Sequence, residues 1–279
     1  MSPGTAGMAL SRPRRPIPVA VIVPAAFFLA LILLRHFLGE GGLATDFGNM
    51  EAPPSSGHPF GTDTLGRDML TRTVRGIAVS LKIGLFAAVV SAAIALVLGL
   101  AAGTLGRWAD LAVSWLVDVA MAMPHLVLLI LISFAAGGGE RGVTLAVALS
   151  HWPALTRVIR AEALQLREAP YVALSRKFGK GAVHIAVHHF LPHLFPQLLV
   201  GLLLLFPHAI LHESALSFLG FGLPPHTPAV GILLAESLRH LSTGSWWLGF
   251  FPGLFLLATV KMVDVLGHAA KRHFYPDRD

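Results

Sequence analysis

The sequence predicts an all-α integral membrane protein that crosses the bilayer with six transmembrane helices. Hydrophobic residues make up 54% of the 279 residues and charged residues only 13%, whereas an ordinary soluble domain carries about 25% charge. Six apolar segments approach the roughly 20 residues that a helix needs to cross the hydrocarbon core. Because so little charge cannot cover a water-soluble globule of this length, the chain is expected to lie in a membrane.

The first span is expected at residues 19–38, after a tail rich in proline and arginine at residues 1–18. A charged start before a short apolar run is also typical of a cleaved signal peptide. Arg35 and His36 follow this run where a cleavage site would need small residues, so an uncleaved first span is predicted.

The remaining five spans follow in order, separated by loops that contain the charged residues. They are expected at residues 79–103, 111–134, 143–159, 194–220 and 248–267. The fourth is short and contains His151, Trp152 and Pro153, while residues 268–279 form a C-terminal tail.

The distribution of positive charge predicts the orientation. Most of the 21 Lys and Arg residues fall on the side of the N-terminal tail, which the positive-inside rule assigns to the cytoplasm. Both termini are therefore expected inside. Residues 39–78 and 221–247 then form outer loops, and residues 161–193 form a cytoplasmic loop. The first and last of these are long enough to expect a function, and the cytoplasmic one is rich in helix formers, which favours docking to a partner.

Several classes of function are excluded by what the sequence lacks. Zero cysteines exclude a disulfide scaffold, a thiolate metal site and a cysteine nucleophile. The chain contains no phosphate loop, no G-x-S-x-G elbow and no H-E-x-x-H zinc helix, so neither ATP hydrolysis nor another catalytic activity is expected of it. The net charge of +6 is spread between apolar runs, which argues against a nucleic-acid partner.

Three stretches of the sequence resemble the permease subunits of ABC importers of the dipeptide/oligopeptide/nickel family. They begin with His58-Pro-Phe-Gly-Thr-Asp-Thr-Leu-Gly-Arg-Asp68, which is similar to the H-P-[LF]-G-T-D-x-x-G-R-D signature of that family. The second is the 166–179 stretch with Leu191-Pro192 after it, and the third is Ser217-Phe-Leu-Gly-Phe-Gly222 followed by Phe251-Pro-Gly253. The resemblance covers nearly everything after residue 55.

The resemblance implies a type I ABC importer permease fold in a bacterial inner membrane, with a cytoplasmic coupling helix. It also implies a second permease subunit, two ATP-binding subunits and a periplasmic or lipid-anchored substrate-binding protein. The chain itself would need no cofactor, because the ATPase subunits use the ATP and Mg²⁺. The periplasmic signature residues carried over from the family are Gly61, Thr62, Asp63, Gly66, Arg67 and Asp68.

The resemblance places the contact with the ATPase in the cytoplasmic loop, on a helix expected at residues 161–178. The residues assigned to this coupling are Tyr171, Ala173, Leu174, Ser175, Gly179, Leu191 and Pro192. At the E-A-A core of the family motif this chain has Ala173-Leu174-Ser175, so the glutamate is absent. Four further histidines in this loop are expected to be interface residues: His184, His188, His189 and His193.

The histidines favour a transition-metal chelate, nickel included, as the cargo over a short peptide. His208 and His212 share a helix face in the fifth span. Glu213 follows directly, and because a glutamate within the bilayer is energetically costly, it is a candidate functional residue. Together with His125 and His151 they are the candidates for the translocation path, and no metal ligand is assigned with certainty. Alternatively, these imidazoles form hydrogen bonds between helices and bind nothing.

Three other functions stay open at this stage. The same architecture would serve a di- or oligopeptide importer. A stand-alone channel or secondary transporter would leave the cytoplasmic loop around Gly179 without a role. An intramembrane enzyme would act without a partner.

Overall fold

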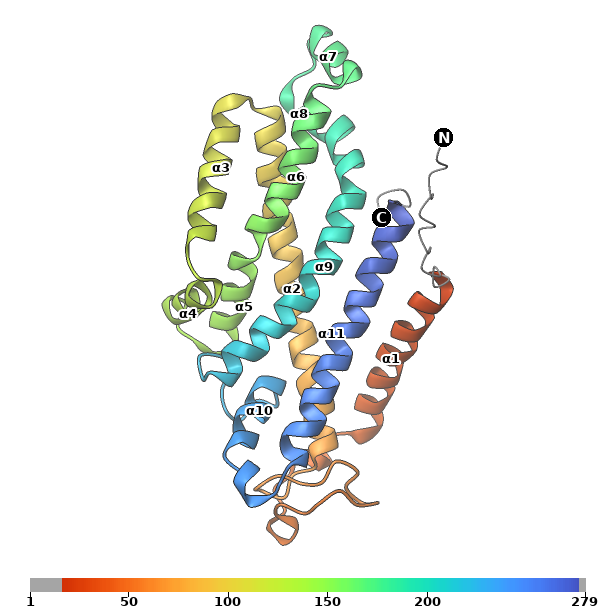
Figure 1. The fold of residues 1–279 in the computed structure, drawn as a ribbon, viewed down its shortest axis with the longest axis vertical. Helices are drawn as coiled ribbons and strands as arrows, with labels where there is room; N and C mark the ends of the chain where they lie inside the picture. The colour runs from red at the N-terminus through yellow and green to blue at the C-terminus, as the bar shows by residue number, and fades with distance from the viewer. Residues whose placement is uncertain (1–16, 276–279) are drawn as a thin grey trace, which may run out of the picture.

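The computed structural model describes residues 17–275, and every regular element in that range is a helix. The expected cytoplasmic tail at residues 1–18 lies almost wholly outside the described residues, as do the last four residues of the tail expected at 268–279. Figure 1 shows an elongated bundle in which the long helices run roughly along the longest axis. The fold is that of an all-helical membrane protein.

Within residues 17–275, four helices are each long and apolar enough to cross a membrane. They are α1 (Ile17–Leu38), α2 (Met69–Thr104), α9 (Leu191–Phe218) and α11 (Trp247–Phe274). The candidate spans number up to five if the bent pair α3 (Arg107–Ala122) and α4 (His125–Ala135) counts as one. The six spans expected from hydropathy are therefore reproduced only in part.

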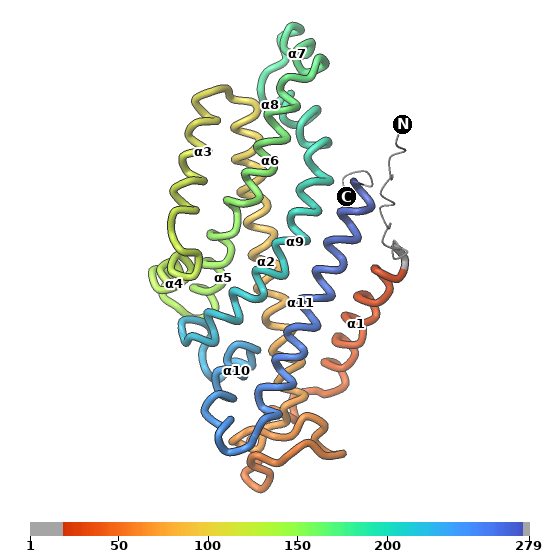
Figure 2. The backbone as a smooth tube through the Cα atoms, viewed as in Figure 1, coloured from red at the N-terminus to blue at the C-terminus, as the bar shows by residue number. Residues whose placement is uncertain are grey.

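The shorter elements lie between these long helices. They are α5 (Gly139–Ser150), α6 (Trp152–Arg167), α7 (Pro170–Lys177), α8 (Ala182–Ile185) and α10 (Val230–Leu238), together with a π-helical turn at Ala186–Phe190 and three 3₁₀ turns at Gly41–Leu43, Phe47–Asn49 and Leu241–Thr243. Figure 2 shows that α7 lies at one end of the molecule, and that the loops before α2 and after α10 lie at the opposite end.

Prolines explain why three expected helices are broken. The third span, expected to be continuous over 111–134, bends by 95° between α3 and α4, because Met123 precedes Pro124 and takes an extended conformation. Ala169 is extended before Pro170 in the same way, so the helix expected at 161–178 divides into the end of α6 and a separate α7.

The fourth expected span, 143–159, is broken at His151. Pro153 has no N–H to donate to the carbonyl of Leu149, four residues earlier. The indole Nε1–H of Trp152 donates to that carbonyl instead, at 2.9 Å. The indole therefore replaces the backbone donor that Pro153 cannot supply, and the break divides the segment into α5 and α6.

Helix α2 starts ten residues earlier than expected, so residues 69–78 belong to it and not to the outer loop. Its first turn is capped by Asp68, whose carboxylate accepts from the backbone N–H and the hydroxyl of Thr71, at 2.8 and 2.7 Å. At 36 residues the helix is about 54 Å long. It therefore extends beyond the roughly 30 Å hydrocarbon core.

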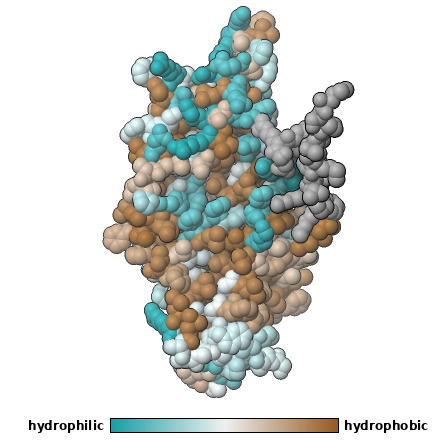
Figure 3. Space-filling view, in the orientation of Figure 1, coloured by the Kyte–Doolittle hydropathy of each residue, from teal (hydrophilic) through white to brown (hydrophobic). Residues whose placement is uncertain are grey.

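The core of the bundle forms where α2 packs against α6 and α9. Small residues permit the close approach: a Cβ added at Gly99 would lie 2.4 Å from the side chain of Ile159 on α6, and one at Gly84 would lie 2.8 Å from Ile210 on α9. Such small-residue contacts are typical of helices packed in membranes. Figure 3 shows hydrophobic residues gathered over the middle of one face and hydrophilic residues concentrated toward the α7 end.

Candidate functional site

The signature segment, residues 58–68, folds around the carboxylate of Asp63. The carboxylate accepts from the backbone N–H groups of Leu65 and Arg67, at 2.8 and 2.9 Å, and from Nε of Arg67 at 2.7 Å. Arg72 on α2 donates a fourth hydrogen bond, at 2.5 Å. This density of charge-assisted bonds fixes the segment onto the start of α2.

Arg72 extends this network to a third element. Its guanidinium also contacts both carboxylate oxygens of Glu236 on α10, at 2.9 and 3.3 Å. Its side chain is only 2% exposed, so three segments distant in the sequence meet at a buried ion-pair cluster. The cluster of Asp63, Arg72 and Glu236 is called the ion-pair lock below. The sequence comparison with the family motif singled out Asp63 but neither Arg72 nor Glu236.

The two glycines of the signature segment have backbone conformations that favour glycine, and neither position has room for a side chain. Gly66 has a φ of +74°, and a Cβ at that position would lie 1.7 Å from the carbonyl oxygen of Asp46. Gly61 has a φ of +71° and closely approaches the carbonyl of Ala52.

Asp46, which lies beside Gly66, is held by local hydrogen bonds. Hydrogen bonds from the Asn49 side chain and the Gly48 N–H lower the pKa of Asp46 below its ordinary value.

The remaining signature residues anchor the segment as well. Thr62 accepts from the N–H of Ala52 at 2.8 Å, and its own carbonyl accepts from the indole of Trp247 on α11, at 3.1 Å. Asp68 caps α2 and lies 3.2 Å from Nδ1 of His58. The signature segment is thus tied to α2, α10 and α11 at one end of the molecule.

The coupling segment, residues 161–193, lies at the opposite end, where α7 projects beyond the body of the bundle (Figure 1). Val172 is buried and anchors α7 in a core with Ile185 and Phe190. Tyr171 and Leu174 point outward, with 46% and 53% of their surface exposed. One face of α7 is therefore fixed and its other face presents apolar side chains to the surroundings.

The other residues assigned to coupling are distributed around α7. Ala173 is exposed, and the hydroxyl of Ser175 lies 2.8 Å from Nε2 of His189. Gly179 follows α7 with a φ of +76°, and its N–H donates to the carbonyl of Arg176 at 2.9 Å. Leu191 and Pro192 begin α9 instead of joining α7.

The histidines of the coupling segment make local contacts. The rings of His184 and His188 stack with centroids 4.1 Å apart. His193 lies 3.4 Å from the carboxylate of Glu162. The ring of His189 also lies edge-on to that of His184, with centroids 6.2 Å apart. The interface role expected of these histidines stays a prediction.

A cavity of about 490 Å³ opens between α3, α4, α6 and α9. His125, His151, His208 and His212 all line it, together with Met121, Met123, Ser150 and Gln197. The structure thus brings together all four histidines proposed for the translocation path. The polar and thioether side chains beside them were not singled out from sequence, because they become neighbours only through the helix breaks at Pro124 and His151.

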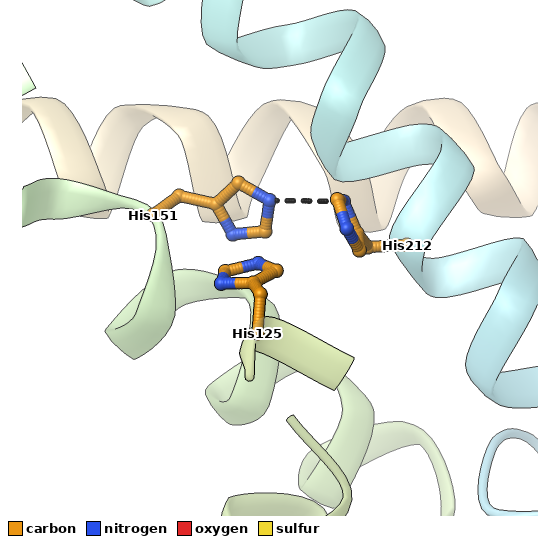
Figure 4. A group of neighbouring side chains, drawn as sticks. All are labelled: His125, His151 and His212. Atoms are coloured by element: carbon orange, nitrogen blue, oxygen red, sulfur yellow. Dashed lines mark hydrogen bonds between the residues drawn. The ribbon is translucent and has the colours of Figure 1, made fainter. Parts of the chain in front are cut away.

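Three of these histidines form a tight cluster, shown in Figure 4, to which His208 does not belong. His125 comes from the first turn of α4, His151 from the break between α5 and α6, and His212 from α9. The three ring centroids lie 4.6–5.0 Å apart. His208 is exposed, and its ring bonds the carbonyl of Leu204 at 3.0 Å.

Glu213 is separated from the histidine cluster. It is fully buried and accepts from the hydroxyls of Ser217 and Ser214, at 3.0 and 3.4 Å. It does not belong to the residues that line the cavity. Its position one residue after His212 turns it about 100° around the helix, toward the packed interior.

Comparisons with known proteins agree on one family. Residues 95–274 match the family model described as a binding-protein-dependent transport system inner membrane component. A putative peptide transport system permease protein of Brucella suis biovar 1 is 36% identical over 254 residues, which cover 91% of this chain and 85% of the relative.

Two further relatives carry similar descriptions. A putative peptide permease protein of Brucella suis biovar 1 is 38% identical over 230 residues, covering 81% of this chain and 76% of the relative. The dipeptide transport system permease protein DppC of Bacillus subtilis is 34% identical over 215 residues, covering 77% of this chain and 67% of the relative.

Proposed function

Because the chain belongs to the family of inner-membrane components of binding-protein-dependent transport systems, we propose that it forms half of the translocation path of a peptide importer. The chain is a non-catalytic permease subunit of an ABC importer, in the inner membrane. We propose that it pairs with a second permease subunit and docks onto two ATP-binding subunits, and that a substrate-binding protein delivers the cargo from outside.

A di- or oligopeptide is the cargo that the relatives favour. The three relatives described above are named for peptides or dipeptides, and none of them for nickel. The metal chelate expected from the histidines is therefore the second candidate, and the histidine-lined cavity is the observation that favours it. Uptake of a radiolabelled dipeptide and of radioactive nickel, measured in the same cells, distinguishes the two cargoes.

The proposed topology has six crossings with both termini in the cytoplasm. Helices α5 and α6 together would supply the crossing that neither is long enough to make alone, since they contain 12 and 16 residues. In Figure 1, α1 begins near the middle of the long axis and runs away from α7, whereas α11 runs toward the end that carries α7. That arrangement supports a cytoplasmic location for both.

The observation that carries the function is the exposed apolar face of α7. A transporter must pass work from a water-soluble ATPase to helices in lipid, and a short helix fixed on one side and exposed on the other suits that task. Tyr171 and Leu174 supply the apolar contact, and Arg176, Lys177 and Lys180 surround it with positive charge. We propose that this surface, called the α7 face below, inserts into an acidic-rimmed groove of the ATPase.

Replacing Gly179 by proline tests this proposal. Proline fixes φ near −65° and has no N–H, whereas Gly179 has a φ of +76° and donates to Arg176. In Gly179→Pro, peptide-stimulated ATP hydrolysis by the purified complex is expected to fall to its unstimulated rate. The control is Gly181→Ala, where φ is −73° and an added Cβ meets nothing within 4 Å. Normal stimulation in Gly179→Pro would show that the segment is only a connector.

A further inference from the structure

The cluster of His125, His151 and His212 has the composition and the spacing of a metal site. One nitrogen of each ring can be chosen so that all three lie within 4.8 Å of one another. The rings of His151 and His212 touch, with Nε2 of His151 lying 3.3 Å from Nδ1 of His212. Two nitrogens bound tetrahedrally to one ion, each at about 2.0–2.1 Å, are separated by about 3.3 Å. Binding would therefore require the rings to move closer together and to turn so that each presents a nitrogen without a proton.

Two of the three rings are oriented by the backbone. Nδ1 of His151 lies 2.8 Å from the carbonyl of Val147, and Nδ1 of His212 lies 2.8 Å from the carbonyl of His208. Since a carbonyl can only accept, each Nδ1 carries the proton and each Nε2 keeps its lone pair. A hydrogen bond of this kind is what fixes the tautomer and direction of metal-binding histidines.

The third ring contains a buried nitrogen that hydrogen bonding leaves unsatisfied. Among the described residues, Nε2 of His125 has no hydrogen-bond partner, although this atom is shielded from solvent. An unpaired buried polar atom costs about 1–3 kcal/mol. Packing by hydrogen bonds alone therefore explains the cluster poorly, because its one internal contact uses the His212 N–H that already donates to His208.

We propose that His125, His151 and His212 bind a divalent transition-metal ion through three neutral imidazoles. Nitrogen ligands favour Zn²⁺, Ni²⁺, Co²⁺ or Cu²⁺ over the oxygen-seeking Mg²⁺ and Ca²⁺. Within the described residues the cluster consists of these three histidines and contains no carboxylate. The nearby carboxylate of Glu213 accepts from Ser217 instead.

Three protein ligands leave a coordination position for another group, as in catalytic and transport sites and unlike closed structural sites. All three rings line the 490 Å³ cavity, so this position opens toward the proposed translocation path. The amino or carboxylate group of a peptide in the cavity would be a suitable fourth ligand.

The three ligands come from three separate parts of the fold. They lie at the break between α3 and α4, at the break between α5 and α6, and on α9. A bound ion would therefore fix these three elements relative to one another.

This inference goes beyond the proposed function and does not depend on the cargo, because it concerns binding by the protein at rest. The test uses the full chain, purified in its assembled transporter with an affinity tag that contains no histidine. Co²⁺ is the probe, because its visible absorption reports nitrogen coordination. We expect one Co²⁺ per chain, displaced by Zn²⁺.

The variants His125→Ala, His151→Ala and His212→Ala are each expected to weaken Co²⁺ binding by at least about tenfold, since even the loss of an outer partner of a metal ligand costs about 10–100-fold. His208→Ala is the matched control, because it lines the same cavity on the same helix but lies outside the cluster. A double variant, His184→Ala with His188→Ala, controls for the stacked pair in the coupling segment.

A thermal measurement guards against variants that merely fold poorly. Zn²⁺ is expected to raise the melting temperature of the wild type and of both controls, but not of His151→Gln, which keeps much of the side-chain volume. Unchanged Co²⁺ stoichiometry in His151→Gln, or no Co²⁺ binding by the wild type at millimolar concentration, would overturn the proposal. Normal Co²⁺ binding in a complex that imports no cargo would leave this site standing and remove the proposed function instead.

Discussion

At one end of the molecule the carboxylate of Asp63 accepts four hydrogen bonds, two of them from arginine side chains. At the other end, Tyr171 and Leu174 present half-exposed apolar side chains with no comparable network around them. The charges of the ion-pair lock are paired within the chain, with Arg67 as the second cation on Asp63. The α7 face leaves exposed the apolar side chains that we propose the ATPase buries. The difference indicates that one end is built as a fixed support and the other as a contact to be completed.

The most direct test of this comparison is whether the two ends lie on opposite sides of the membrane. The chain contains no cysteine, so single cysteines can be labelled without background. Ser56→Cys and Thr243→Cys, both exposed, are expected to react fully with an impermeant maleimide added to spheroplasts. Ser175→Cys and the exposed Lys177→Cys are expected to react only after the membrane is opened. Labelling of Ser175→Cys in intact spheroplasts would refute the topology.

The largest energetic effect is expected from breaking the ion-pair lock. Arg72→Met removes the ion pairs of the buried guanidinium with Asp63 and Glu236, while Asp63 keeps its bonds to Arg67 and to two backbone N–H groups. Because removing one member of a fully buried pair costs about 3–5 kcal/mol, a loss of about 3 kcal/mol is expected here. The free energy of unfolding of the purified chain in detergent measures this loss. Arg239→Met, at an exposed arginine of the same end, is the control and is expected to change stability by less than about 0.5 kcal/mol. Equal effects of the two substitutions would mean that the lock does not stabilise the signature segment.

Substitutions at two neighbouring residues of α7, Val172 and Leu174, are expected to have different effects on the stability of the chain and on its affinity for the ATPase. Val172→Ala removes two buried methyl groups and should destabilise the chain by about 2 kcal/mol. Leu174→Ala removes exposed surface, so the stability of the isolated chain should change by less than about 0.5 kcal/mol. The affinity for the ATPase subunit, measured by titration of the purified partners, should nevertheless fall by about tenfold or more if Leu174 is a central contact. Unchanged affinity in Leu174→Ala would move the contact away from the α7 face.

Two glycines with nearly the same backbone, one at each end, extend the comparison. Gly66 and Gly179 have φ values of +74° and +76°, so alanine costs about 1–2 kcal/mol at either position through left-handed strain. At Gly66 the new Cβ would also lie 1.7 Å from the Asp46 carbonyl, whereas at Gly179 it would meet nothing within 4 Å. Gly66→Ala is therefore expected to be the more destabilising change in thermal unfolding. A larger effect at Gly179 would show that the coupling segment is packed more tightly than the signature segment.

Much of the fold could be predicted from composition, because long apolar runs must become helices in a membrane. The start of α2 was missed by ten residues, although Asp68 and Thr71 carry a recognisable N-terminal cap. The breaks at Pro124 and Pro170 also had a local signal, since the residue before a proline is pushed out of the helical conformation. Hydropathy alone does not contain that information.

The candidate site was predictable only in part. His208 and His212 share a helix face, as their spacing indicates, yet the cluster contains His212 with His125 and His151 and leaves His208 outside. That grouping depends on the 95° bend between α3 and α4 and on the break at His151, which together bring three separate elements to one point. The partnership of Arg72 with Glu236, which spans 164 positions, likewise has no local signature.

The length of α2 has a mechanical consequence for such a transporter. The helix starts beside the Asp68 cap, packs on α9 at Gly84, and near its other end packs against Ala163 of α6 through Gly103. If a continuous helix about 54 Å long tilts about the Gly84 contact, its two ends move in opposite directions. A few degrees of tilt, applied at the end that packs on α6, would thus displace the segment held by Arg72 at the other end of the molecule.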